Sequence, residues 1–117
     1  MVNGSANGIN GNSNYIQGSQ NGVIGNANIA NGSNNLIAGS VNQVNGGSNK
    51  LIGNFNTING NSNLMNGNQN NATGSQNNIT GNLNTINGTQ NMLSGTSNTV
   101  VGSDNQVIGD GNTIYND

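Results

Sequence analysis

The sequence predicts an all-β fold: a two-sided, flattened β-solenoid (β-roll) with eight 14-residue coils, each made of two seven-residue repeats. Three observations predict it. Glycine recurs at every seventh position, an Asn follows each of these glycines by three residues, and an aliphatic side chain follows each by five. We expect one solenoid domain over residues 1–117, with the regular repeats over residues 4–115.

The repeat begins at Gly4 and has the consensus Gly-(Ser/Asn/Thr)-x-Asn-x-Φ-x, where Φ is aliphatic. A period of seven is typical of coiled coils, but one apolar position per heptad and a loss of roughly 1 kcal/mol per helical glycine argue against a helix. Because Asn and Φ lie two residues apart, a short strand points both side chains to one side. Gly and the small polar residue after it make the corner, where Asn-Gly pairs such as Asn31-Gly32 are expected to tolerate positive φ.

Consecutive heptads, numbered from Gly4, alternate in the residue after glycine. Odd heptads mostly carry Ser (Ser5, Ser19, Ser33, Ser75, Ser103), and even heptads mostly carry Asn (Asn12, Asn26, Asn54, Asn68, Asn82). The period is therefore fourteen, with one strand of each coil on each side. At a strand spacing of about 4.8 Å, eight coils give a rod roughly 38 Å long.

The predicted interior is thin, since each coil contributes only two aliphatic side chains. Sixteen such side chains at about 1.5–3 kcal/mol each cannot alone offset backbone ordering at about 1–2 kcal/mol per residue. We therefore expect the sixteen repeat Asn residues to form ladders whose amides bond along the rod axis.

Composition excludes most other functions. The chain has no Cys and no His, and its net charge of −2 argues against nucleic-acid binding. A phosphate-binding G-x-x-x-x-G-K-[ST] motif is absent, and three Asp residues are too few for a calcium-binding repeat. We expect no enzyme activity, metal, cofactor or membrane contact. The N-terminus has neither a basic nor an apolar region, so we expect no signal peptide in this chain.

Outward side chains differ between the two sides. In even heptads the residue between Asn and Φ is Thr in four coils, and the full rank is Tyr15, Ile29, Gln43, Thr57, Asn71, Thr85, Thr99 and Thr113. The second outward rank on this side is Gln17, Asn31, Asn45, Asn59, Thr73, Asn87, Val101 and Tyr115. We call these two ranks the threonine face. Thr favours strands in general, but that preference does not explain why Thr occurs between Asn and Φ only in even heptads, and so on only one face of the rod.

The repeat resembles the x-x-N-x-V-x-G repeat of the ice recrystallisation inhibition proteins of cold-hardy grasses, the ryegrass antifreeze type. Matching segments include Asn56-Thr57-Ile58-Asn59-Gly60, Asn84-Thr85-Ile86-Asn87-Gly88 and Asn98-Thr99-Val100-Val101-Gly102. The sequence departs from the family in preferring Ile to Val inside, in placing Asn before Gly, and in the interruptions at Tyr15, Ile29 and Gln43.

The resemblance implies a left-handed β-roll that binds ice, inhibits its recrystallisation through one flat face and depresses the freezing point weakly. It also implies secretion to the apoplast. Position by position, the implied ice-binding residues are Thr57, Asn59, Asn71, Thr73, Thr85, Asn87, Thr99, Val101 and Thr113. The partner is then an ice surface, and the protein is expected to be a monomer whose open ends allow end-to-end association. Two alternatives remain: a structural or adhesive solenoid segment, and a designed self-assembling repeat.

Overall fold

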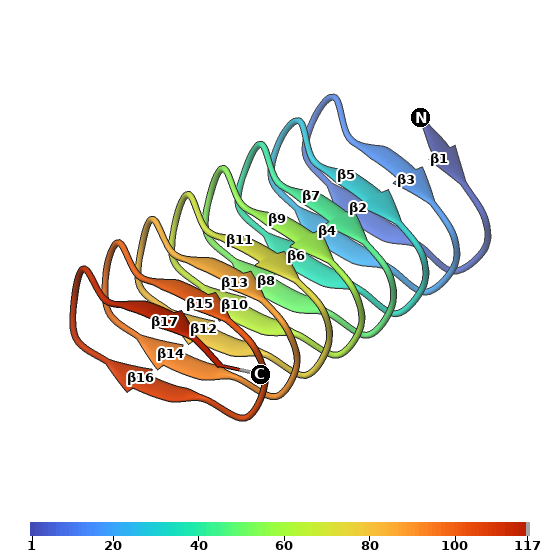
Figure 1. Ribbon diagram of the computed structural model, residues 1–117. Coiled ribbons are helices and arrows are strands. Elements are labelled where there is room, and N and C mark those ends of the chain that lie inside the picture. The colour runs from blue at the N-terminus through green and yellow to red at the C-terminus, as the bar shows by residue number, and fades with distance from the viewer. Residues whose placement is uncertain (117) are drawn as a thin grey trace.

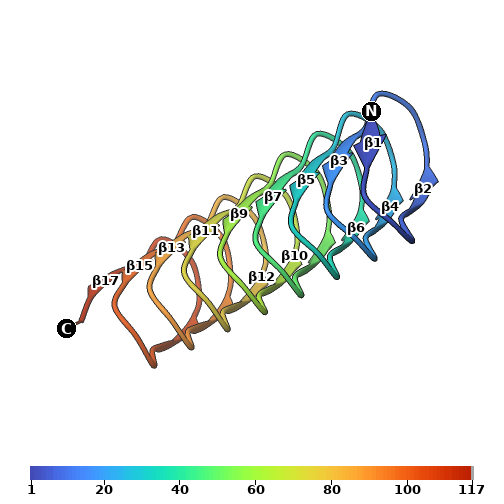
Figure 2. The same cartoon turned by 90° about the vertical axis from the view of Figure 1, so that its right-hand side faces the viewer.

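The computed structural model describes residues 1–116 as a rod of stacked coils with two parallel β-sheets facing each other (Figure 1). Its principal extents are 39 × 21 × 13 Å, which agrees with the length predicted for eight coils. The chain advances along the rod one coil at a time, so the two termini lie at opposite ends (Figure 2). The predicted two-sided β-solenoid is confirmed.

The eight even heptads, together with a short strand before Gly4, form the nine-stranded sheet, whose outer surface is the threonine face. Its strands are β1 (Val2–Asn3), β3 (Tyr15–Gln17), β5 (Ile29–Asn31), β7 (Gln43–Asn45), β9 (Thr57–Asn59), β11 (Asn71–Thr73), β13 (Thr85–Asn87), β15 (Thr99–Val101) and β17 (Thr113–Tyr115). Neighbouring strands pair in parallel at an offset of fourteen residues, as in Ala72 with Ile58 and Ile86. The predicted coil length is therefore correct.

Odd heptads form the eight-stranded sheet, whose outer surface we call the opposite face. Its strands are β2 (Gly8–Asn10), β4 (Gly22–Ile24), β6 (Leu36–Ala38), β8 (Lys50–Ile52), β10 (Leu64–Asn66), β12 (Asn78–Thr80), β14 (Met92–Ser94) and β16 (Gln106–Ile108). Each strand is short because glycine ends it and turns the chain toward the other sheet.

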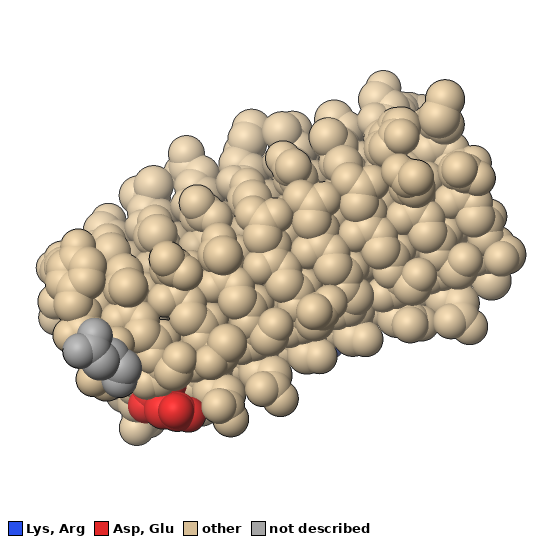
Figure 3. All heavy atoms as spheres, turned by 45° about the vertical axis from the view of Figure 1, so that its right-hand side comes forward, with Lys and Arg blue, Asp and Glu red and all other residues tan. Residues whose placement is uncertain are grey.

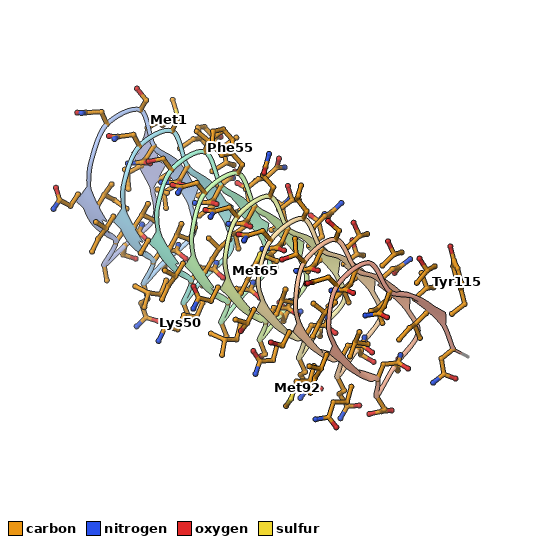
Figure 4. All side chains as sticks on the ribbon, turned by 90° about the vertical axis from the view of Figure 1, so that its left-hand side faces the viewer. Met1, Lys50, Phe55, Met65, Met92 and Tyr115 are labelled. Carbon is orange, nitrogen blue, oxygen red and sulfur yellow. The ribbon has the colours of Figure 1, made fainter. Side chains whose placement is uncertain are left out.

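The core is a single file of aliphatic side chains from each sheet. The fourteen Φ residues from Ile16 to Val107 are buried, and Ile9 and Ile114, in the two end coils, pack against them while partly exposed. Met65 lies between the sheets, whereas Lys50 and Met92 point outward (Figure 4). The alternation that the sequence predicts within each strand is thus realised over the length of the rod.

The repeat Asn residues form two continuous ladders inside the corners. Asn70 is representative: its Oδ1 accepts bonds from the backbone N and the Nδ2 of Asn84 at 3.0 and 3.1 Å. Its Nδ2 donates to Asn56 Oδ1 at 3.2 Å and to the carbonyl oxygen of Gly81 at 2.8 Å. Both lone pairs and both N–H groups of the amide are therefore used, which removes the cost of burying it. The predicted ladders are confirmed, and the bond to the corner carbonyl is an addition to them.

Glycine is required at the repeat corners from Gly4 to Gly102 for two reasons. Gly60 has φ +145°, and a Cβ there would lie 1.8 Å from the carbonyl oxygen of Gly74 in the next coil. The sequence-based expectation for Asn-Gly pairs holds only for their glycine, because Asn31 is a strand residue. The left-handed residue is instead the one two positions after glycine, for example Val41 or Phe55 with φ 59°. Its side chain is exposed and varied, so no sequence preference marks it.

The Ser/Asn alternation also has a structural counterpart. In the corners of even heptads, the backbone N of Asn54 donates to Asn68 Oδ1 at 2.9 Å, and the Asn54 Nδ2 reaches the same oxygen at 3.2 Å. In the corners of odd heptads, the hydroxyl of Ser33 accepts from the backbone N of Ser19 at 3.2 Å. Both residue types therefore satisfy a corner N–H, and Asn adds a second bond between coils.

Candidate functional site

The threonine face presents two straight ranks of side chains along the rod. The register aligns Thr57, Asn71, Thr85, Thr99 and Thr113 in the first rank. The same pairings align Asn59, Thr73, Asn87 and Val101 in the second. All nine residues of the sequence-predicted site therefore lie on one surface. They are exposed, apart from Thr57, Thr99 and Val101, which are half-buried.

The parallel sheet fixes the spacing of these groups. Side chains in one rank repeat at about 4.8 Å, and the two ranks lie about 6.7 Å apart along each strand. Thr suits such a position because its branched Cβ restricts χ1 and favours extended backbone. Each Thr then offers a methyl group and a hydroxyl from a nearly fixed position.

The N-terminal part of the first rank is different. Tyr15 and Ile29 stand there with 42% and 40% of their surface exposed, followed by Gln43. These three residues interrupt the Thr rank, as the sequence indicated. The second rank beside them contains Asn31 and Asn45, which the sequence did not identify as site residues; the only indication was the recurrence of Asn at this position.

The opposite face lacks a rank of one residue type. Its outward positions mix Gly22, Leu36, Lys50, Leu64 and Asn78. Two corner residues of the even heptads, Phe55 and Leu83, are also large, apolar and more than half exposed. Of the two faces, only the threonine face therefore has the same residue type in three neighbouring coils.

The surface is also nearly uncharged. The chain has one Lys and three Asp, and the acidic atoms visible in Figure 3 gather at the end that holds the C-terminus. No pocket is found over residues 1–116, and no group of three or more potential metal ligands occurs there. This part of the chain also contains no helix that could span a membrane. A flat periodic array of neutral groups suits contact with a repeating solid rather than a small molecule.

Comparison with known proteins agrees with this geometry. The family model described as the grass antifreeze beta roll matches residues 37–116, which is more than half of the chain. A search of curated proteins finds no match. The matched region contains all nine predicted site residues and begins after the interruptions at Tyr15 and Ile29. The chain therefore belongs to the grass antifreeze β-roll family, a family of ice-binding proteins.

Proposed function

We propose that the protein inhibits ice recrystallisation, with weak depression of the freezing point, by adsorbing to ice through the threonine face. The observation that carries the proposal is the in-register alignment of Thr85, Thr99 and Thr113 with Asn71 and Thr57 across five adjacent coils. Membership of the antifreeze family supports it.

The chemistry of the face fits adsorption to a solid. Each Thr or Asn makes only a weak contact with water, but many such groups on one rigid sheet meet a surface together. Their contributions then combine because the coil has already fixed their relative positions. The Thr methyl groups order water without a charge that would hold a hydration shell. Adsorbed protein on grain boundaries slows the growth of large ice grains.

The contact residues in this proposal are the nine of the sequence-based site. They are Thr57, Asn71, Thr85, Thr99 and Thr113 in the first rank, with Asn59, Thr73, Asn87 and Val101 in the second. We propose that the protein acts as a non-catalytic monomer on ice outside the cell, in agreement with the family to which it belongs.

The proposal is tested by placing one bulky group on each face. Thr85→Tyr introduces an aromatic ring in the middle of the threonine face, where Thr85 is exposed and lies between Asn71 and Thr99. Asn78→Tyr introduces the same ring at the equivalent repeat position of the opposite face, between the ladder residue Asn77 and the core residue Ile79. Both variants are checked by circular dichroism and then compared in an assay of ice-grain growth.

We expect Thr85→Tyr to lose most of the parent's inhibition, because one protrusion separates the neighbouring side chains from the flat ice surface. Asn78→Tyr should retain it. Full activity of Thr85→Tyr together with loss of activity in Asn78→Tyr would show that the opposite face, and not the threonine face, contacts ice. A parent that does not inhibit grain growth would reject the function and favour a structural or adhesive role.

A further inference from the structure

The second rank of the threonine face contains Asn in three consecutive coils. Asn31, Asn45 and Asn59 occupy paired positions on β5, β7 and β9. Their side chains are bonded to one another: Asn31 Nδ2 donates to Asn45 Oδ1 at 3.0 Å, and Asn45 Nδ2 donates to Asn59 Oδ1 at 2.9 Å. This outer amide ladder is separate from the two ladders inside the corners.

The outer amide ladder fixes groups that are mobile on most surfaces. Asn45 uses one lone pair of Oδ1 and one N–H of Nδ2 within the ladder, which leaves one acceptor and one donor for water. Asn31 and Asn59 end the ladder with one bond each, and Asn31 Oδ1 is buried without a partner, so the three amides are held about 4.8 Å apart but differ in the groups that they leave to water. Because their rotamers are already set, ordering them against a surface costs little entropy.

The outer amide ladder includes two coils, those of β5 and β7, in which the first rank has no Thr. Beside Asn31 and Asn45 the first rank holds Ile29 and Gln43, and Thr begins only at Thr57. The equivalent second-rank position of the opposite face shows no such ladder. Asn66, at that position on β10, pairs with Ile52 and Thr80 rather than with another Asn, and makes no side-chain hydrogen bond within residues 1–116.

We infer that the outer amide ladder Asn31–Asn45–Asn59 extends the ice-contacting surface into the N-terminal half of the threonine face, an inference that rests on the function proposed above. The immobilised amides replace Thr as the regular groups that meet ice in these coils. The contact surface is then continuous from β5 to β17 rather than confined to the C-terminal half.

The test removes the middle amide and compares it with an amide on the other face. Asn45→Ala deletes both ladder bonds, and Asn45→Asp keeps the shape but cannot donate to Asn59. Asn66→Ala is the matched control, since it makes the same substitution at the same repeat position of the opposite face. The lowest concentration that stops ice-grain growth is measured for folded parent, variants and Thr85→Tyr.

We expect this concentration to rise roughly two- to tenfold for both Asn45 variants, the effect of having to immobilise side chains on binding, and to stay unchanged for Asn66→Ala. If one Asn45 variant does not reach the parent's circular dichroism spectrum, the other decides. Asn45 variants as active as Asn66→Ala, with Thr85→Tyr inactive, would overturn the ladder's role while the proposed function stands. A parent without activity would overturn both.

Discussion

The interior of the coil and the threonine face share one 14-residue register but differ in how strictly the sequence follows it. Inside, Gly and Asn recur without exception. A Cβ at Gly60 would have no room, and no other side chain could replace the amide of Asn70. Outside, the first rank accepts Tyr15, Gln43 and Thr85 on equivalent strands. The difference shows that contacts inside the coil set the lattice, and that the outer side chains occupy it without determining it.

Among the substitutions considered, adding one methyl group at a corner glycine should lower the stability of the fold most. We expect Gly60→Ala to destabilise the fold by more than about 4 kcal/mol, because φ +145° is unfavourable for Ala and its Cβ would meet the Gly74 carbonyl oxygen. Urea unfolding followed by circular dichroism measures it. Gly8→Ala is the control, since a Cβ there meets nothing within 4 Å; similar losses in the two variants would contradict the corner argument.

A smaller effect is expected from the buried ladder. Asn70→Ala leaves the Gly81 carbonyl oxygen and the backbone N–H of Asn84 without partners and removes one bond from each of the side-chain amides of Asn56 and Asn84, a cost of about 1–3 kcal/mol. The neighbouring Gln69 is exposed, so Gln69→Ala should change the thermal midpoint little. Equal midpoints for the two variants would mean that the ladder does not hold the coils together.

The smallest effect concerns the left-handed corner residue. Val41 has φ 59°, a conformation that β-branched residues adopt only under strain, and its side chain is exposed. Asn tolerates this conformation, so Val41→Asn should stabilise the fold by roughly 0.5–1 kcal/mol. A lower thermal midpoint for this variant would show that Val41 makes a stabilising contact that outweighs its backbone strain.

Much of this architecture could be predicted from the sequence because one coil repeats throughout the chain. The spacing of Asn56 and Ile58 fixed which side chains face inward, and the alternation of Ser5 with Asn12 gave the coil length. The left-handed residues could not be predicted, since exposed positions such as Val41 and Phe55 carry no common residue type. The bond from Asn70 to the Gly81 carbonyl depends on how the corner turns in space.

The candidate site also has one part that the sequence predicts and one part that it does not. Alignment of Thr57, Thr85, Thr99 and Thr113 follows from the period alone, because equivalent positions of stacked coils must meet. The hydrogen bonds between Asn31, Asn45 and Asn59 depend on side-chain rotamers, which a repeat pattern does not specify. Sequence therefore predicted the Thr rank and not the outer amide ladder.

The central claim, that the rod meets ice through its threonine face, is tested most directly by incorporation into growing ice. Fluorescently labelled parent, Thr85→Tyr and Asn78→Tyr, all folded, are presented to a slowly growing ice hemisphere, and the protein taken up is measured. We expect strong uptake of the parent and of Asn78→Tyr, with little uptake of Thr85→Tyr. Equal uptake of the two tyrosine variants, or exclusion of the parent, would contradict it.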